Sequence, residues 1–401
     1  MNQKKDMNIL VVAVINLMKQ IYFDNAATTK VDERVLKKML PFFDEFYANC
    51  HAVHTQGQVA LEAVEEARES IARNLEVDSQ EVIFTSGATE SNNISIRGVV
   101  EKFIKDNKKI HIITSSIEHP SVLEIFKYYQ KNDLVEVSFI PVNEQGVVKL
   151  DKLESLIRDN TVLISVMYVN NEIGTIQPIE KIASMIKDKD IILHVDAVQA
   201  FNYINCSPNL LNCDLMSFSG HKIHGPKGIG VLYVKAGTKL DPIQHGGHQE
   251  FNIRSGTLNV PGIVAIAEAV NVVYAEREKN IKKTKGVKDE LIRELNKIND
   301  IKLNGAEQNQ IPSLINVSFL KAEGESILMM LDMDGIAIST GSACSSGSLE
   351  PSHVLTAIGR KPEWTHGSIR ISLGKFNNLT EVPVFMKSVI TIIKKLREMA
   401  P

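Results

Sequence analysis

The chain has 401 residues, of which 44% are hydrophobic and 23% charged, and its formal net charge is −3. This composition is ordinary for a globular protein, and at roughly 100–200 residues per domain the length predicts two domains. The near-neutral charge and the lack of a concentrated basic stripe argue against nucleic acid as a partner.

The first stretch, residues 1–20, is predicted to be an extension that lies outside the fold. Lys4-Lys5 precede a short apolar run, which resembles the start of a signal peptide. No small-x-small cleavage site follows, and the run is far shorter than the ~20 residues that a membrane helix needs. Two interpretations remain: a short extra strand or helix, or a true start at Met18. We favour the second, because the organised pattern begins at Ile21–Asn25, and we expect residues 1–17 to be dispensable and the protein not to bind membranes.

From residue 21 onward, apolar runs alternate with helical patterns. Asp32 caps a short helix that Pro41 ends, and an amphipathic helix follows with apolar residues from Leu61 to Leu75 at 3–4 spacing. Buried strands alternating with helices are typical of an α/β domain with a mainly parallel sheet covered on both faces. The predicted strands are Val82–Thr85, Ile110–Thr114, Val162–Val169, Ile191–Val195, Leu215–Phe218 and the returning Gly228–Val234.

The pattern changes after about Val272. A long charged helix from Tyr274 to Lys297 is followed by short strands at Leu314–Phe319 and Ile369–Leu373, and a helix runs to Met399. We therefore expect a large domain over residues 21–271. An alternative is that the first residues of this range belong to the small domain. A smaller α+β domain covers residues 272–401.

Lys222 is the residue around which we interpret the chain. It lies on a tight polar turn between the apolar runs Leu215–Phe218 and Gly228–Val234, where a protein can desolvate an amine and lower its pKa. Most lysines in turns are simply surface residues. Asp196, however, ends the preceding strand. An aspartate and a lysine on successive strand ends fit pyridoxal phosphate, whose aldehyde the lysine holds and whose ring nitrogen the carboxylate keeps protonated.

Polar groups also follow the other strands of the predicted sheet. Ligands of open α/β sheets bind beyond the carboxyl ends of the strands, and small residues at a helix start suit a phosphate. No recognised metal-ligand spacing occurs, which excludes a metal site from our prediction. The five strand ends carry Thr85–Glu90, Ser115–His119, Asn170–Glu172, Asp196–Gln199 and Ser219–Lys222.

A second chemical element is Cys344, in the loop Ser339–Pro351. Glycine and serine surround this thiol, so packing does not explain it, and we interpret it as a nucleophile on a loop that can swing. The other three cysteines are predicted to be buried and inert. Four scattered cysteines favour a reducing, cytoplasmic setting over a disulfide framework. Arg370, on a short strand, suits a substrate carboxylate, with a structural salt bridge as the alternative.

Together these motifs resemble the cysteine desulfurases of the class V aminotransferase group, which are fold-type I pyridoxal-phosphate enzymes. The resemblance runs in order from about residue 21 to the end and is carried by seven motifs. They are Phe23–Thr29, Thr85–Asn93, Asn170–Gly174, His194–Gln199, Ser217–Gly230, Arg254–Thr257 and Ser342–Cys344.

The resemblance assigns roles to individual residues. It implies that Lys222 bears pyridoxal 5′-phosphate and abstracts a proton from the substrate, that Cys344 receives sulfur, and that Arg370 and Asn171 bind the substrate. It also implies a homodimer, because Thr257 would contact the phosphate in the partner subunit. His119 is the third catalytic residue: it would stack on the ring and share in the proton steps. The remaining cofactor contacts implied are Ala88, Thr89, Ser219, Gly220 and His221 around the phosphate, Asp196 at the ring nitrogen, and Asn171 with Gln199 near the ring oxygen.

The implied reaction converts L-cysteine to L-alanine and leaves a persulfide on Cys344. The sulfur would pass to an acceptor protein such as an iron–sulfur scaffold, or serve tRNA thiolation, and the ending Ser348–Pro351 resembles the long-loop branch. Two alternatives stay open: a selenocysteine lyase or other class V aminotransferase, and a catalytically silent partner-binding homologue. The chain departs from the family at Cys50-His51 and at His248–Phe251, near the expected substrate mouth.

Overall fold

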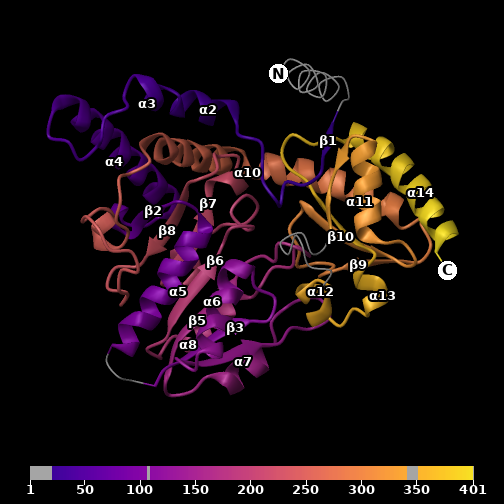
Figure 1. The fold of residues 1–401 in the computed structure, drawn as a ribbon, viewed down its shortest axis with the longest axis horizontal. Coiled ribbons are helices and arrows are strands. Elements are labelled where there is room, and N and C mark those ends of the chain that lie inside the picture. The colour runs from indigo at the N-terminus through magenta and orange to yellow at the C-terminus, as the bar shows by residue number, and fades with distance from the viewer. Residues whose placement is uncertain (1–19, 106–108, 341–350, 401) are drawn as a thin grey trace, which may run out of the picture.

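The computed structural model describes residues 20–105, 109–340 and 351–400. Its large sheet has seven strands in the described residues, in the order β2-β8-β7-β6-β5-β3-β4 (Figure 1). Strands β3 to β7 pair in parallel, and β8 runs antiparallel between β7 and β2. This confirms the mainly parallel sheet. The strands are β2 (Val82–Thr85), β3 (His111–Ser115), β4 (Glu136–Ile140), β5 (Thr161–Met167), β6 (Ile192–Asp196), β7 (Leu215–Ser219) and β8 (Gly230–Val234).

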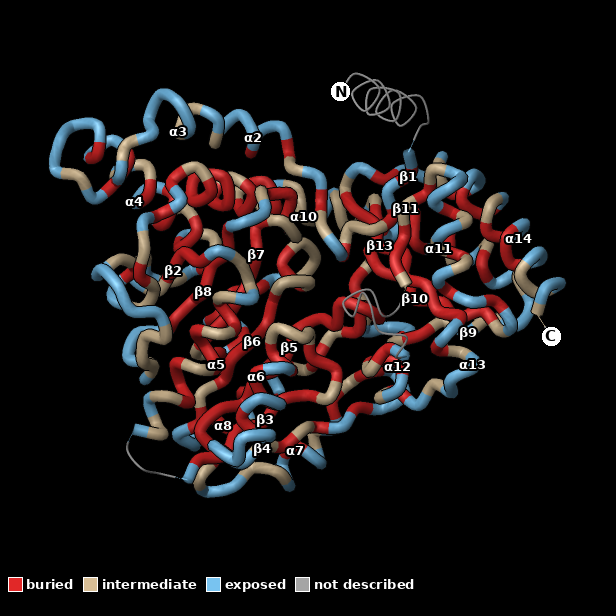
Figure 2. Tube along the Cα trace, in the orientation of Figure 1, coloured by how far each residue is buried: buried red, intermediate tan, exposed pale blue. Residues whose placement is uncertain are grey.

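Helices cover both faces of this sheet. Side chains alternate along each strand, so Ile83 packs with α5 and α6 on one face, whereas its neighbour Phe84 joins α4, α8 and α10 on the other. Figure 2 shows the buried strands inside, with the exposed segments α2 and α3 at the rim. The helices up to residue 295 are α2 (Glu33–Met39), α3 (Pro41–Asp44), α4 (Thr55–Leu75), α5 (Ala88–Ile104), α6 (Pro120–Lys131), α7 (Leu150–Leu156), α8 (Ile179–Ile186), α9 (Pro208–Leu211) and α10 (Val260–Leu295).

The long helix α10 begins at Val260, earlier than the predicted start at Tyr274. Asn259 caps it by accepting a hydrogen bond from the N–H of Gly262 at 3.2 Å. Its first turns are buried on every side, for example at consecutive residues 263–267. A fully buried helix shows no amphipathic period, which is why the sequence pattern placed its start too late.

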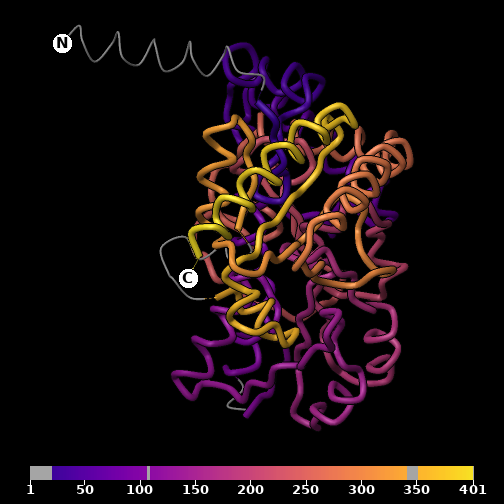
Figure 3. Tube along the Cα trace, turned by 90° about the vertical axis from the view of Figure 1, so that its right-hand side faces the viewer, coloured from indigo at the N-terminus to yellow at the C-terminus, as the bar shows by residue number. Residues whose placement is uncertain are grey.

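A second sheet follows α10 and has four strands among the residues that the structure describes, in the order β12-β13-β10-β9. It has its own hydrophobic core with α11 and α14, and α14 lies at the surface of this part of the molecule (Figure 3). The division of the chain at residue 272 stays a prediction. The remaining elements are β9 (Ile301–Asn304), β10 (Leu314–Phe319), α11 (Gly324–Met333), β11 (Ile336–Ala337), β12 (Ser339–Thr340), α12 (His353–Ala357), α13 (Pro362–Thr365), β13 (Ser368–Ser372) and α14 (Val382–Met399).

The N-terminal strand β1 (Ile21–Tyr22) joins this second region, because it pairs in parallel with β11. Asp24 then bridges to Ser372 at the end of β13. The chain therefore passes between the two sheets within its first described residues, and residues 24–29 reach the edge of the large sheet. Within the described ranges, no helix combines the length and apolar character that crossing a membrane requires.

Candidate active site

A cavity of about 760 Å³ lies where β5, β6 and β7 end. Residues from both sheets line it, because Asp196 ends β6 of the large sheet while Arg370 lies on β13 of the second. The structure thus brings together most of the site residues predicted from the sequence. Those that line the cavity are Ala88, Thr89, His119, Asn171, Asp196, Gln199, Ser219, His221, Lys222 and Arg370.

Lys222 ends a single 3-10 turn, Gly220–Lys222, that follows β7 directly. The turn is held by the N–H of Gly220, which donates to the carbonyl of Ile229 at 3.0 Å. Nζ of Lys222 donates to the carbonyl oxygens of Ala26 and Ala27, the latter at 2.9 Å. The N-terminal segment therefore fixes the amine in the cavity, which explains why two motifs almost two hundred residues apart act on one group.

Asp196 and His119 belong to one hydrogen-bonded network that the sequence analysis missed. The amide Nδ2 of Asn92 donates to Oδ2 of Asp196 and to Oγ of Ser121, both at 2.9 Å. Oγ of Ser121 in turn lies 2.8 Å from Nδ1 of His119. The other oxygen of Asp196 accepts from the N–H of Val198 at 3.1 Å. Asn92, in the second turn of α5, is the sequence feature that could have pointed to this network, because a buried asparagine side chain needs hydrogen-bond partners.

The protonation of His119 follows from its place as N-cap of α6. Nδ1 accepts a hydrogen bond from the N–H of Ser121 at 3.1 Å, so a neutral ring carries its proton on Nε2. Burial lowers the pKa of His119 below its ordinary value, and the charges of neighbouring residues, Lys222 among them, modify it further. A neutral, half-buried imidazole beside Lys222 and Asp196 is therefore available to stack on a ring or to pass a proton.

The first turn of α5 faces the same cavity and suits an anion. Its backbone N–H groups at Ala88 and Thr89 belong to the donors that a helix start leaves without intrahelical partners. The turn before α5 packs closely on β8, because a Cβ on Gly230 would lie 2.7 Å from the Cα of Gly87. His221 lines the same cavity. Burial and, to a smaller extent, the charge of Lys222 lower the pKa of His221 to about 4. A phosphate there would meet N–H donors and a neutral imidazole.

Arg370 closes the cavity on the side of the second sheet and is almost fully buried, with 2% of its surface exposed. Its two terminal nitrogens donate to the carbonyl of Asn171 and to Oδ1 of Asp24, both at 3.0 Å. Nε has no hydrogen-bond partner among the described residues. Gln199, another residue of the cavity, donates to the carbonyl of Ala26 at 3.1 Å and so holds the N-terminal segment. The pair with Asp24 is the salt bridge that the sequence left as an alternative, and the unpaired Nε leaves capacity for a carboxylate.

Two predicted residues do not line the cavity. Gly220 supports the turn instead, because a Cβ on it would lie 2.9 Å from the side chain of Ile229. Thr257 is exposed. Cys344 lies outside the described residues. The other three cysteines, Cys50, Cys206 and Cys213, are buried as predicted.

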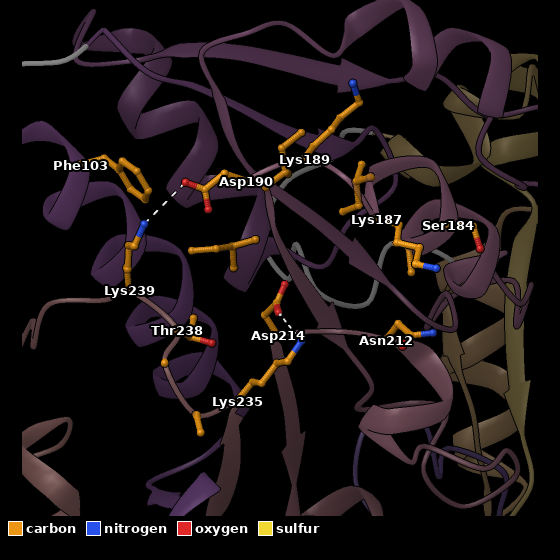
Figure 4. Close-up of a pocket in the computed structure, with 16 residues that line it drawn as sticks. Phe103, Ser184, Lys187, Lys189, Asp190, Asn212, Asp214, Lys235, Thr238 and Lys239 are labelled. Atoms are coloured by element: carbon orange, nitrogen blue, oxygen red, sulfur yellow. Dashed lines mark hydrogen bonds and ion pairs between the residues drawn. The ribbon is translucent and has the colours of Figure 1, made fainter.

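A second cavity, of about 640 Å³, lies at the opposite edge of the sheet (Figure 4). It borders the starts of β6 and β7 and the end of the antiparallel β8, and none of the predicted site residues lines it. Lys235 pairs with Asp214 at 3.2 Å, and Lys239 lies 3.6 Å from Asp190. The chemistry predicted for the strand ends therefore belongs to the first cavity alone.

Comparisons with known proteins show the family to which the chain belongs. Residues 21–385 match the family model described as aminotransferase class-V. A cysteine desulfurase IscS from Dictyoglomus turgidum is 45% identical over 386 residues, which are 96% of this chain and 97% of that protein. A solved NifS-like protein has a TM-score of 0.85 and 39% identity, covering 95% of this chain and 99% of its own. A structure described as SspA in complex with cysteine has a TM-score of 0.78 and 36% identity, over 89% of this chain and 99% of that one.

Proposed function

This chain belongs to the aminotransferase class-V family, and we propose that it acts there as a cysteine desulfurase that converts L-cysteine to L-alanine and delivers the sulfur to an acceptor. The observation that carries the proposal is the convergence of Lys222, Asp196 and Arg370 in one cavity. The similarity to relatives described as cysteine desulfurases, and to a protein described in complex with cysteine, supports cysteine as the substrate.

Pyridoxal 5′-phosphate is the cofactor, and the residues of the cavity fit it. The helix start at Ala88 and Thr89 offers N–H donors to a phosphate, and Ser219 and His221 line the same cavity. When bound, the cofactor supplies an aldehyde that takes up an amine and a ring that accepts electrons from the adjoining carbon. Asp196, held by Asn92, would keep a proton on the ring nitrogen.

The other residues of the cavity act on the substrate. Arg370 would bind the carboxylate of cysteine through its guanidinium fork. Lys222 would remove the proton from Cα, since its Nζ lies in the cavity beside the carbonyls of the N-terminal segment. His119 would stack on the ring and share in proton transfer, and Asn171 with Gln199 would border the oxygen side of the ring. Thr89, Ser219 and His221 would surround the phosphate.

Sulfur transfer would use Cys344. Its thiolate would attack the sulfur of the bound cysteine, and an S–S bond would form as the C–S bond breaks. The carbon fragment would take up a proton at Cβ and regain at Cα the proton that Lys222 removed, which gives alanine. The product on the enzyme is a persulfide, so atoms and electrons balance without an added oxidant. An acceptor thiol then removes the outer sulfur, and we propose an iron–sulfur scaffold protein as the acceptor.

A homodimer is part of the proposal. Thr257 is exposed and does not line the cavity of its own chain, which supports a contact with the partner's cofactor. Large apolar side chains are also exposed on the chain, such as Phe251 at 45%, six residues before Thr257 in the sequence, and Phe43 at 59%. Such groups mark surfaces that a second copy can cover. We also propose a cytoplasmic location, which the small number of scattered cysteines favours.

The proposed activity is tested by incubating the purified holoenzyme with L-cysteine and measuring alanine and sulfide, with and without a candidate scaffold. We expect stoichiometric alanine and sulfur, and faster turnover when an acceptor is present. Selenocysteine and amino-group acceptors are the comparison substrates. A clear preference for selenocysteine, or amino transfer without alanine, would replace the proposal with one of the related activities.

A further inference from the structure

Glu172 is a buried acid that the proposed reaction does not use, although it directly follows the cavity residue Asn171. Only 4% of its surface is exposed, and its carboxyl group accepts a hydrogen bond from Oγ of Ser352. Burial raises the pKa of Glu172 to about 7, against smaller opposing effects of Ser352 and Arg370. A carboxyl group at this depth is costly without a partner, so the bond to Ser352 is a defining contact of this position.

Ser352 connects the chain that follows Cys344 to helix α12. It lies eight residues after Cys344 in the sequence and is the N-cap of α12, where its Oγ accepts from the N–H of Leu355 at 3.1 Å. The same hydroxyl thus caps the helix and donates to Glu172. Through it, the chain that leads away from Cys344 is tied to the loop after β5.

The next residue makes a second tie to the cavity wall. Nε2 of His353 donates to the carbonyl of Glu118 at 3.0 Å, and Glu118 immediately precedes His119. The start of α12 is therefore bonded to two loops, those that carry Asn171 and His119.

The loop of Glu172 is itself held in place from the second sheet. Nδ2 of Asn316, on β10, donates to the carbonyl of Glu172 at 3.1 Å. Arg370, on β13, donates to the carbonyl of Asn171 at 3.0 Å. The backbone at Asn171 and Glu172 is thus held by two hydrogen bonds from the second sheet. A carboxyl group on such a backbone can hold Ser352 in a defined position.

We propose that Glu172 and Ser352 form a positioning pair that anchors the chain following Cys344 to the cofactor cavity and so supports sulfur transfer. The inference rests on the proposed function, since it needs Cys344 as the sulfur acceptor. Glu172 acts through Ser352 and touches neither substrate nor reacting atoms. Its loss should therefore slow the step that uses Cys344 and spare the steps that use Lys222.

Two readouts on the holoenzyme separate these steps. The first is the change in visible absorbance of the bound cofactor when cysteine is added, which needs the cavity but not Cys344. The second is alanine formed in a single turnover, which needs Cys344. Glu172→Ala and Ser352→Ala should each slow alanine formation about 10-fold or more, the scale of one lost hydrogen bond to a buried acid, with the absorbance change retained.

Three further variants sharpen the test. Glu172→Gln keeps an oxygen that accepts from Ser352, and should restore alanine formation to within about 3-fold of wild type, less than the loss of one hydrogen bond. The double variant Glu172→Ala/Ser352→Ala should be no slower than the slower single one, because both remove the same bond. Thr356→Ala, on the same helix but exposed, is the matched control for damage to α12 and should behave like wild type.

The proposal is overturned if the absorbance change and alanine formation fall together, if Glu172→Gln is as slow as Glu172→Ala, or if the two single losses add in the double variant. Should Glu172→Ala fail to fold, Ser352→Ala and Glu172→Gln still decide the matter. Cys344→Ala distinguishes the two levels. If Cys344→Ala still releases alanine, the proposed sulfur step is wrong. If Cys344→Ala releases no alanine but Glu172→Ala forms it at the wild-type rate, only the proposed anchoring role of Glu172 is refuted.

Discussion

Replacing Asn92 with alanine removes the amide that joins Asp196 to Ser121. Both hydrogen bonds are 2.9 Å long and buried or nearly so. The oxygen of the same amide has no partner among the described residues, so its removal costs nothing. Alanine also has the higher helix propensity inside α5, by up to about 0.7 kcal/mol. These two effects offset part of the stability that is lost with the two hydrogen bonds, so the apoenzyme should still fold.

The cost should fall on cofactor binding. In the apoenzyme the cavity is open, and water can replace the amide at the carboxylate of Asp196. In the holoenzyme the ring excludes that water, so the lost bond is not replaced. A hydrogen bond to a charged group contributes about 1.5–3 kcal/mol. Because 1.4 kcal/mol is tenfold, the dissociation constant of pyridoxal phosphate should rise about 10- to 100-fold.

The assay is titration of the apoenzyme with pyridoxal phosphate, followed by visible absorbance, with thermal unfolding of the apoenzyme measured in parallel. Asn93→Ala is the matched control: the neighbouring asparagine donates to the carbonyl of Thr89 at 2.9 Å in its own helix. It should bind the cofactor like wild type. Equal losses in both variants, or wild-type affinity in Asn92→Ala, would refute the role assigned to this network.

The other predictions concern the amine, the thiol and a buried imidazole. Lys222→Ala should lose the visible band that cofactor binding gives, while Lys227→Ala, in the same cavity, should keep it; a wild-type band in the first would mean that another lysine binds the aldehyde. Cys344→Ala should keep the absorbance change with cysteine and lose alanine release by orders of magnitude, and Cys206→Ala should turn over normally, since burial raises the pKa of that thiol to about 12. Burial lowers the pKa of His194 to about 3. Below about pH 6.5 the imidazole of His194 therefore binds a proton in the unfolded chain, while in the folded chain it stays neutral. Stability should therefore fall by about 1.4 kcal/mol per pH unit through this site as pH decreases from about 6.5. When the unfolding free energy is measured with urea at several pH values, it should depend less steeply on pH in His194→Gln than in wild type. An equal dependence on pH in both proteins would contradict this.

Much of the site followed from local sequence patterns. The apolar run before Ser219 and the glycines after it place Lys222 on a turn at a strand end, and the same reasoning places Asp196 at the end of the neighbouring strand. Parallel strands bring their carboxyl ends to one edge, so these residues had to lie together. Periodicity and turn chemistry are short-range properties, which is why residues within one element could be assigned from the sequence.

Contacts between distant segments could not be read in this way. Nothing in the pattern around Asp24 predicts its bond to Arg370, and the pairing of β1 with β11 joins residues over three hundred positions apart. The partners of buried polar groups were missed for the same reason. Asn92 could be recognised as polar in a helix, but Asp196 as its acceptor depends on how α5 lies against the sheet.

The sequence by itself therefore determined the class of fold, the edge of the sheet that holds the chemistry and the residue types that supply it. The tertiary structure alone decided how those residues are held: Lys222 by the carbonyls of Ala26 and Ala27, and Glu172 by Ser352. The physical reason is that side-chain hydrogen bonds are fixed by the packing of whole elements, while strands, turns and caps are fixed by neighbours along the chain.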